Sequence, residues 1–451
     1  MSGYLIVSYQ NVYGLSIQPR NEGEHDMSTE IIGGKTEPNR HSITGETKTN
    51  LPAPLHPARS AHIIRDDREA IAVASRLASR FAQEASARDR DRRLPLKELD
   101  EFSQSGLWGI TVPKEYGGAG VSNVTLAEVT AIIAEADSSL GQIPQNHFYM
   151  VEAVRLDGSE AQKKFYFERV LAGDRFGNAF CELGTRTVFD FQARLRADDG
   201  KLVLGGKKFY STGALFAHWI SVVAKDDEGK IVVVFVKQGT DGATVIDDWS
   251  SFGQRTTASG TVILDNVNVA PFAVLPHQAS FERPTPMGPI AQIIHAAVDV
   301  GIARAALADT IDFVRRYTRP WIDSGQEHGY EDPYTIAQIG DLQIRVHAAD
   351  ALLERAGRYV DAAVASPSDR SVAEASVAVA EVKALATETS ILVTNKLFEL
   401  AGTRSTLAEY NLDRHWRNAR THTLHDPVRW KYHAIGNFWL NGVNPPRHGA
   451  S

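Results

Sequence analysis

The chain has 451 residues, of which 43% are hydrophobic, so it is long and apolar enough to form about two or three packed units and is not a disordered protein. Its 48 basic and 55 acidic residues leave a net charge of −7, which disfavours a protein that coats nucleic acid or an anionic membrane. The single cysteine, Cys181, allows no intrachain disulfide and no all-cysteine metal site.

The longest apolar runs, such as IVVVFV at 231–236, are far shorter than the roughly 18 residues that a membrane helix needs. The N-terminus also lacks the basic segment that precedes the hydrophobic stretch of a secretory signal. We therefore expect a cytoplasmic protein with no membrane partner and no nucleic-acid partner.

The first 60 residues are polar and turn-rich, with no sustained apolar period. This composition predicts a flexible N-terminal arm over 1–60, in which Met27 is an alternative native start.

A helical pattern follows the arm and predicts an α-helical domain over 61–174. Its first helix carries an apolar stripe that includes Leu77 and Phe81. The segment LPLKELDEFSQSG predicts a second helix that ends at Gly106. Further helices are expected at about 125–137, 145–156 and 160–171.

The period changes near Phe176, where alternating and apolar runs are separated by turns such as DDG and DDEG. These runs predict antiparallel strands and hairpins in a central β domain over 175–285.

Long helical patterns return after a proline-rich link and predict a four-helix bundle over 286–451. Asp332 is the expected N-cap of the second long helix, with Pro333 in its first turn, and Gly402 is expected to end the third. Segregated helices and strands indicate an α+β fold and not a doubly wound sheet. The expected helices span about 289–317, 333–364, 372–400, 407–420 and 427–439.

The local motifs of several common enzyme classes are absent from the sequence. It contains no GxGxxG, GxxxxGK[ST], HExxH or GxSxG pattern. The usual nicotinamide, nucleotide, zinc-protease and serine-hydrolase interpretations therefore have no local support.

Four motifs in this order, ITVPKEYGGAG, GKKFYSTGA, GQRTTASGTVILDNVNV and LFELAGTRST, resemble the acyl-CoA dehydrogenase superfamily over about 65–440. The resemblance implies an N-terminal helical domain, a central β domain and a C-terminal bundle, with a flavin in the groove between the β domain and the bundle. It also implies a homotetramer.

The segments DDWSSFGQRTTASG, EDPYTIAQIGD and RHWRNARTHTLHDPV are more similar to the dibenzothiophene monooxygenase branch and to related oxidoreductases of bacterial sulfur acquisition. That resemblance implies a two-component monooxygenase that receives FMNH2 from a separate NAD(P)H-flavin reductase. The enzyme would use molecular oxygen, through a flavin C4a-hydroperoxide, to oxidise a small organosulfur compound. FAD in place of FMN is an alternative.

The segment RTHTLHDP, at 420–427, holds the main catalytic candidate, His425. The resemblance places it over the flavin ring as the acid/base, and an imidazole titrates near working pH. His422 is the candidate for a second histidine at the site. The alternatives are a helix start at Asp426 and an HxxH zinc pair, but the sequence marks no third ligand, so no metal is expected.

Two polar residues of the β region complete the catalytic set that the resemblance implies. Thr212 matches the family's hydroxyl near flavin N5, and Asn178 matches an asparagine that faces the flavin and oxygen. The alternatives are an ordinary turn hydroxyl and a strand-end amide that bonds its own backbone.

The resemblance implies five cofactor-binding residues. Ser259 matches a position near the flavin, and Trp249 either stacks or fills a domain interface. Arg319 and Arg404 match arginines that reach the flavin phosphate from a neighbouring subunit, although each could instead be a solvated side chain. Gly402 either admits the cofactor or only ends its helix.

The segment GQIPQNHFYM falls where the family builds its substrate pocket and supplies Gln142, Asn146 and His147. Thiophene-oxidising members carry a histidine and a tyrosine where Gln142 and Asn146 stand. This departure favours a smaller and more polar sulfur compound, such as a sulfone or a sulfinate. His147 either touches the substrate or packs in the core.

Two other functions remain as alternatives. An FAD-dependent acyl-CoA dehydrogenase would need a glutamate base, but no glutamate follows Glu409. A non-enzymatic nucleic-acid-binding member of the fold would use the cluster of basic residues at 414–431, which is interleaved with aspartates.

Overall fold

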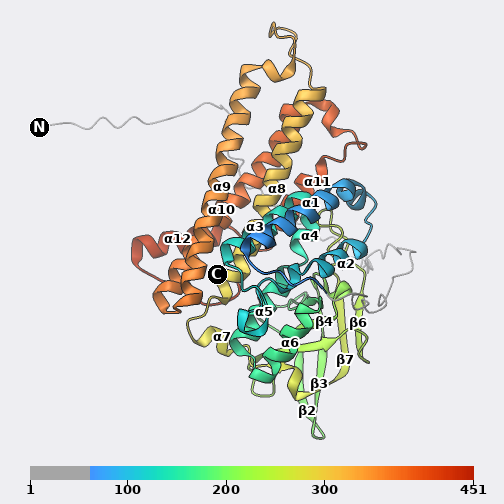
Figure 1. The fold of residues 1–451 in the computed structure, drawn as a ribbon, viewed down its shortest axis with the longest axis vertical. Coiled ribbons are helices and arrows are strands. Elements are labelled where there is room, and N and C mark those ends of the chain that lie inside the picture. The colour runs from blue at the N-terminus through green and yellow to red at the C-terminus, as the bar shows by residue number, and fades with distance from the viewer. Residues whose placement is uncertain (1–60, 451) are drawn as a thin grey trace, which may run out of the picture. The chain divides into compact units, whose positions relative to one another are not determined.

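The computed structural model describes residues 61–450, so the arm predicted over 1–60 lies outside the described residues. Helices come first, a sheet follows, and long helices return, as the colours in Figure 1 show. The predicted α+β fold is confirmed. The boundaries predicted between the domains stay predictions.

The helices of the N-terminal part begin and end at residues that the sequence marks. The side chain of Asp66 accepts the N–H of Glu69 at the start of α1, and Gly106 closes α2 at a φ of +83°. The five-residue helix α4 was not predicted, because it is too short to show a period. The helices are α1 (Asp67–Arg90), α2 (Leu96–Ser105), α3 (Asn123–Ala136), α4 (Ser138–Gln142), α5 (Gln145–Asp157) and α6 (Glu160–Leu171).

The sheet follows the order β6-β7-β3-β2-β4-β5-β8, and β1 pairs with β4 beside this path. The β2–β3 and β4–β5 hairpins are antiparallel as predicted, whereas β1 runs parallel to β4. The sheet is therefore not wholly antiparallel, which corrects that part of the prediction. The strands are β1 (Phe176–Ala179), β2 (Arg194–Asp198), β3 (Lys201–Lys208), β4 (Trp219–Lys225), β5 (Ile231–Lys237), β6 (Ala243–Ile246), β7 (Thr261–Val269) and β8 (Val274–Leu275).

The C-terminal helices confirm the predicted caps. Asp332 accepts two backbone N–H groups at the start of α9, and Gly402 ends α10 at a φ of +75°. Helix α11 begins six residues later than predicted, because the preceding chain turns through a 3-10 segment and through Asn411 at a φ of +48°. The helices are α7 (Ala279–Glu282), α8 (Met287–Tyr317), α9 (Pro333–Ala365), α10 (Asp369–Ala401), α11 (Asp413–His422) and α12 (Arg429–Asn441).

Helix α8 is the central helix of the C-terminal part. By length and composition it is the one described helix that is apolar enough to cross a membrane, but 94% of its apolar window is buried within the protein. It packs against α3 on one side and against α9 and α10 on another. It is therefore a core helix, and polar side chains on it lie deep inside the protein.

Candidate active site

A cluster of hydroxyl groups lies where β1, the loop after β3 and the segment before β7 meet. The Ser259 hydroxyl lies 2.7 Å from the Thr212 hydroxyl and 2.7 Å from that of Thr257. The backbone N–H of Asn178 donates to the carbonyl of Thr212, and its side-chain amide reaches the carbonyl of Tyr210 at 3.4 Å. The structure thus brings together three residues that the sequence singled out: Asn178, Thr212 and Ser259.

The loop at 249–259 joins this cluster to α11. A β-carbon on Gly253 would stand 1.9 Å from the carbonyl oxygen of Arg417, so only glycine permits the contact. The next N–H, of Gln254, donates to the Asn418 side chain at 2.7 Å. The indole of Trp249 donates to the Gln254 carbonyl. The loop therefore fixes α11 against the β region.

The last residue of α11 is His422, whose side chain is buried and bonded on both ring nitrogens. Its Nδ1 lies 2.5 Å from Oδ1 of Asp299 on α8. Its Nε2 lies 3.0 Å from Oε1 of Gln142 and 3.3 Å from Nδ1 of His295. The other oxygen of Asp299 accepts from the Lys383 ammonium at 2.6 Å. Asp299 and Lys383 therefore form a buried ion pair that is hydrogen-bonded to His422.

His425 lies in the turn that follows α11. Its ring packs on that of His295, with the centroids 3.9 Å apart. Its Nδ1 lies 3.4 Å from Oδ1 of Asp426, whose other oxygen is buried and has no hydrogen-bond partner among the described residues. The side chain of His425 is 44% exposed, whereas those of His295 and His422 are buried. Of the three histidines, only His425 is open to a ligand.

The segment that carries the hydroxyl cluster approaches the helix that carries Gln142. A β-carbon on Gly213, next to Thr212, would lie 3.3 Å from the side chain of Ile143. Ile143 in turn follows Gln142, which is bonded to His422. The β wall and the helical wall thus meet within a few residues of each other.

Burial and charge set the protonation of the helical wall. Burial lowers the pKa of His422, against the opposing effect of Asp299. Burial, with His425 and His422 nearby, lowers the pKa of His295 well below its usual value. Burial alone would raise the pKa of Asp299, but Lys383 and His422 outweigh it and hold this pKa at about 2. At neutral pH the two buried histidines are neutral and Asp299 is a carboxylate.

The residues predicted to bind substrate differ in their surroundings. Gln142 lines the histidine cluster, as described above. The amide of Asn146 donates to the Ser221 hydroxyl at 2.8 Å. His147 is fully buried, and its two nitrogens bind the Trp108 carbonyl and the Phe176 N–H. These contacts account for His147 as a packing residue, the second of the two roles expected for it.

Arg319 and Arg404 lie together at the opposite end of α8 from His295. Thr318 bonds the Ala401 carbonyl, and the Arg404 guanidinium lies 4.3 Å from the ring of Tyr317. Since a helix rises about 1.5 Å per residue, this end of α8 lies roughly 30 Å from His295. Within one chain these arginines do not join the histidines.

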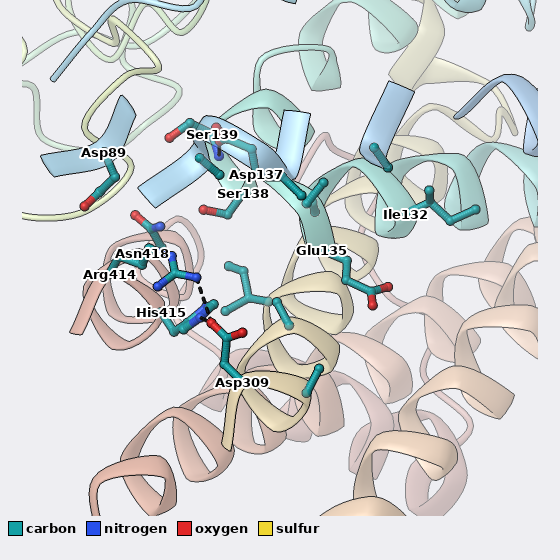
Figure 2. Close-up of a pocket in the computed structure, with 18 of the residues that line it drawn as sticks. Asp89, Ile132, Glu135, Asp137, Ser138, Ser139, Asp309, Arg414, His415 and Asn418 are labelled. Atoms are coloured by element: carbon teal, nitrogen blue, oxygen red, sulfur yellow. Dashed lines mark hydrogen bonds and ion pairs between the residues drawn. The ribbon is translucent and has the colours of Figure 1, made fainter. Parts of the chain in front are cut away.

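A cavity of about 500 Å³ lies between α1, the α3–α4 junction, α8 and α11 (Figure 2). None of the predicted site residues lines it. Among its charged groups, Arg414 and His415 both contact Oδ2 of Asp309 at 2.7 Å. The lining of the cavity does not include His425.

Three further residues of the helical wall escaped sequence analysis: His295, Asp299 and Lys383. Each is a polar residue inside a long apolar helix, as in IIHAAVDVGIARAAL. A charged residue in such a run is rarely buried without a partner, so the isolated aspartate was the available signal.

The walls of this site fit the reactive end of a flavin. A flavin ring edge carries oxygen and nitrogen acceptors, which the Thr212 and Asn178 side chains can meet with hydroxyl and amide donors. The phosphate requires cationic groups, and the predicted ones lie at the far end of the bundle. Within one chain, these side chains can meet the ring edge, and Arg319 and Arg404 lie far from them.

Family models that describe the N-terminal, middle and C-terminal domains of acyl-CoA dehydrogenases match residues 66–174, 186–267 and 293–430. The chain belongs to this family. It is 36% identical to the dibenzothiophene monooxygenase of Rhodococcus erythropolis over 84% of this chain and 95% of the relative. It is 33% identical to a probable FMNH2-dependent monooxygenase of Pseudomonas putida over 84% of this chain and 96% of the relative.

Two solved structures are similar over nearly their whole length. FMN-bound TdsC of Paenibacillus sp. A11-2 matches with a TM-score of 0.81 and 32% identity, over 85% of this chain and 100% of that one. Methanesulfinate monooxygenase of Pseudomonas fluorescens matches with a TM-score of 0.78 and 31% identity, over 84% of this chain and 99% of that one. Both likenesses extend across the helical and β parts that build the site.

Proposed function

We propose that this chain is a two-component, FMNH2-dependent monooxygenase that oxidises a small organosulfur compound in sulfur acquisition. The observation that carries the proposal is the placement of His425. It is the open member of a histidine cluster whose other rings are buried, and Gln142 and Ile143 connect this cluster to the loop that carries Thr212. The family relatives named as FMNH2-dependent and FMN-bound support the same class of enzyme and the same cofactor.

The chain's own residues supply positioning and proton control. Reduced flavin, when bound, would activate molecular oxygen for transfer of one atom to the sulfur compound. His425 holds a proton next to that chemistry and can return it, because its ring is exposed and lies beside the carboxylate of Asp426. Thr212 and Asn178 hold the flavin edge, and Trp249 keeps the supporting loop in place.

Gln142 and Asn146 favour a small, polar substrate. In this site both side chains are engaged, with His422 and Ser221 respectively, and neither offers a large aromatic surface. A sulfinate or a small sulfone suits such walls better than a fused thiophene. A structural relative named as a methanesulfinate monooxygenase makes this size class reasonable.

The phosphate of the flavin is bound by Arg319 and Arg404 of a second copy. This assignment follows from the roughly 30 Å between those arginines and His295 along α8. Each flavin site then contains residues of two chains. A homotetramer, which is a pair of dimers, supplies such pairs of chains. Gly402 shapes the loop that carries Arg404, since its φ of +75° suits glycine.

The protein works in the cytoplasm with a separate NAD(P)H-flavin reductase and binds neither membrane nor nucleic acid. The net charge of −7 and the burial of α8 support this assignment. An FAD-dependent acyl-CoA dehydrogenase is the less favoured function, because its reaction needs a free carboxylate as base. Both oxygens of Asp299 are already bonded, and Asp426 lies against His425.

The test supplies the purified protein with FMNH2 from any flavin reductase and offers small sulfones, sulfinates and aryl sulfides in parallel. The proposal predicts oxygenated product from a small sulfone or sulfinate and little from aryl sulfides. Tightly bound yellow FAD that acyl-CoA bleaches without oxygen would instead identify a dehydrogenase.

A further inference from the structure

The ion pair between Asp299 and Lys383 is the most deeply buried charged contact at the site. Their side chains are 0% and 1% exposed, and they join α8 to α10 at 2.6 Å. Neither residue belongs to the catalytic or binding set expected from the sequence. A buried ion pair alone is weak evidence of stabilisation, because apolar residues of similar size often replace such pairs without loss. The pair therefore calls for a role beyond joining two helices.

His422, which is also bonded to Asp299, indicates that role. Asp299 divides its two oxygens: Oδ2 takes the Lys383 ammonium and the Thr387 hydroxyl, and Oδ1 takes Nδ1 of His422 at 2.5 Å. A carboxylate can only accept hydrogen bonds, so Nδ1 of His422 must carry a proton. Lys383 keeps Asp299 ionised and holds its second oxygen, which leaves the first one aimed at the imidazole.

The protonation of His422 fixes the next contact. Its ring is buried and neutral, so a proton on Nδ1 leaves a bare lone pair on Nε2. That atom lies 3.3 Å from Nδ1 of His295, which can donate an N–H to it. Oε1 of Gln142 lies 3.0 Å from the same atom and can only accept, so the Gln142 amide meets a bare Nε2 when it is turned to present its NH2 group. The hydrogen bonds then run in one direction, from His295 through His422 to Asp299.

The order of these bonds matters for His425. The ring of His295 packs on that of His425 at 3.9 Å, so a charge on His295 would oppose a proton on His425. A neutral His295, held by a neutral His422, removes that opposition. The two buried rings beneath His425 then keep one fixed arrangement of protons.

We propose that Asp299 and Lys383 are positioning residues: their ion pair fixes His422 with its proton on Nδ1 and so presents a bare Nε2 to His295 beneath His425. This inference rests on the proposed function, because it supports a histidine whose work that function defines. Asp299 and Lys383 touch neither substrate nor flavin in this assignment and act through His422.

The direct test is the tautomer of His422 in the flavin-free protein. Histidine labelled with 15N gives separate signals for protonated and bare ring nitrogens, and the His422→Phe variant identifies those of His422. We expect a protonated Nδ1 and a bare Nε2 in the wild type. In Asp299→Asn the side-chain amide can donate to Nδ1, and the proton should move to Nε2. The inference is overturned if the wild type carries the proton on Nε2, or if Asp299→Asn leaves the tautomer unchanged.

The second readout is coupling, the fraction of consumed FMNH2 that yields oxidised sulfur product. Asp299→Asn should lower coupling by on the order of tenfold or more, as loss of oriented acid–base catalysis does. The double variant Asp299→Asn/Lys383→Met leaves no unpaired ammonium, so its melting temperature should recover while coupling stays low. Recovery of coupling together with stability would reduce the pair to a link between helices and overturn the inference.

Thr387→Val is the matched control, because Thr387 contacts the same oxygen as Lys383, at 3.2 Å, without a charge. It should keep the wild-type tautomer and coupling, and a loss equal to that of Asp299→Asn would contradict the assignment. A wild type that oxidises no sulfur compound would contradict the proposed function alone. The tautomer, measured without flavin or substrate, would still decide the role of Asp299.

Discussion

The imidazoles of His295 and His425 pack against each other in a tilted arrangement near the end of α11, with ring centroids 3.9 Å apart and planes inclined by 36°. One ring is buried in α8 and the other is open, so the pair marks the boundary between the supporting wall and the reaction space. Because His425 is exposed and His295 is buried, a substitution of His425 can be compared with a substitution that changes the buried wall.

Replacing His425 with alanine should uncouple oxygen use from product formation. The exposed imidazole is the group placed to hold and return a proton, and such groups contribute about 10²–10⁴-fold to rate. We expect FMNH2 oxidation to continue, hydrogen peroxide release to rise and product yield to fall by at least about tenfold. Product and peroxide are measured in the same reaction.

His433→Ala is the control for this change. His433 is an exposed histidine on α12 that packs on Trp430, away from the cluster. Its replacement should leave the product yield unchanged. Equal yields from His425→Ala and the wild type would remove His425 from the mechanism.

His147 should make folding stability depend on pH below about 6.5. Burial lowers its pKa to about 3, so between these values the unfolded chain binds a proton that the folded chain does not. Stability is therefore fully present above pH 6.5 and is lost as the pH falls. One such group contributes up to about 1.4 kcal/mol per pH unit to the slope.

Comparison of the wild type with His147→Gln, by chemical denaturation between pH 4 and 6.5, isolates that slope. The variant should be less stable at every pH. Its free energy of unfolding should also change less steeply with pH, by up to the slope of about 1.4 kcal/mol per pH unit that one proton contributes. Parallel curves for the two proteins would show that His147 is not a buried neutral histidine.

Gly253→Ala should release the 249–259 loop from α11. The added carbon would meet the Arg417 carbonyl at 1.9 Å, which the backbone can relieve only by moving. Overpacking of this kind costs roughly 1–3 kcal/mol. Since the loop also leads to Ser259, FMN affinity should fall as well, as measured by quenching of flavin fluorescence.

Gly436→Ala serves as the comparison, because its added carbon meets nothing within 4 Å in α12. It should stabilise the protein slightly and leave FMN affinity unchanged. A Gly253→Ala protein with normal stability and flavin affinity would contradict the role of the loop.

Arg319→Ala and Arg404→Ala should each weaken FMN binding, since each removes a cation from the phosphate. If the arginines come from a second copy, mixing Arg319→Ala with His425→Ala subunits should regenerate intact sites. With random pairing, about a quarter of the sites recover. Activity is measured after joint refolding or co-expression.

The hybrid experiment needs each variant alone to be inactive at the FMN concentration used. Mixed subunits that remain inactive would place the arginines in their own chain's site or outside any site.

The sequence predicted those parts of the fold that local pattern specifies. The caps at Asp332 and Gly402 and the long helices were found because their periods and end signals are strong. The parallel pairing of β1 with β4 was missed, because it joins strands that are distant in the chain and no hairpin turn marks it. The start of α11 was misplaced because Asn411 adopts a left-handed conformation that the periodicity does not reveal.

The site was predicted by its motifs and only in part. Thr212, Ser259 and Asn178 lie in marked segments, and the structure brings them together. Asp299 and Lys383 have no motif, because their meaning comes from a contact between α8 and α10 that only packing creates. Arg319 and Arg404 were expected from the resemblance, and their distance from His295 follows only from the geometry of α8.

The central claim is that this chain transfers one atom of molecular oxygen to a sulfur compound with reduced flavin. The most direct measurement supplies FMNH2 and a small sulfinate or sulfone under 18O2 and weighs the product by mass spectrometry. The account predicts one 18O atom in each product molecule and none when labelled water replaces labelled oxygen. Product that carries oxygen from water, or flavin that acyl-CoA reduces without any oxygen uptake, would contradict it.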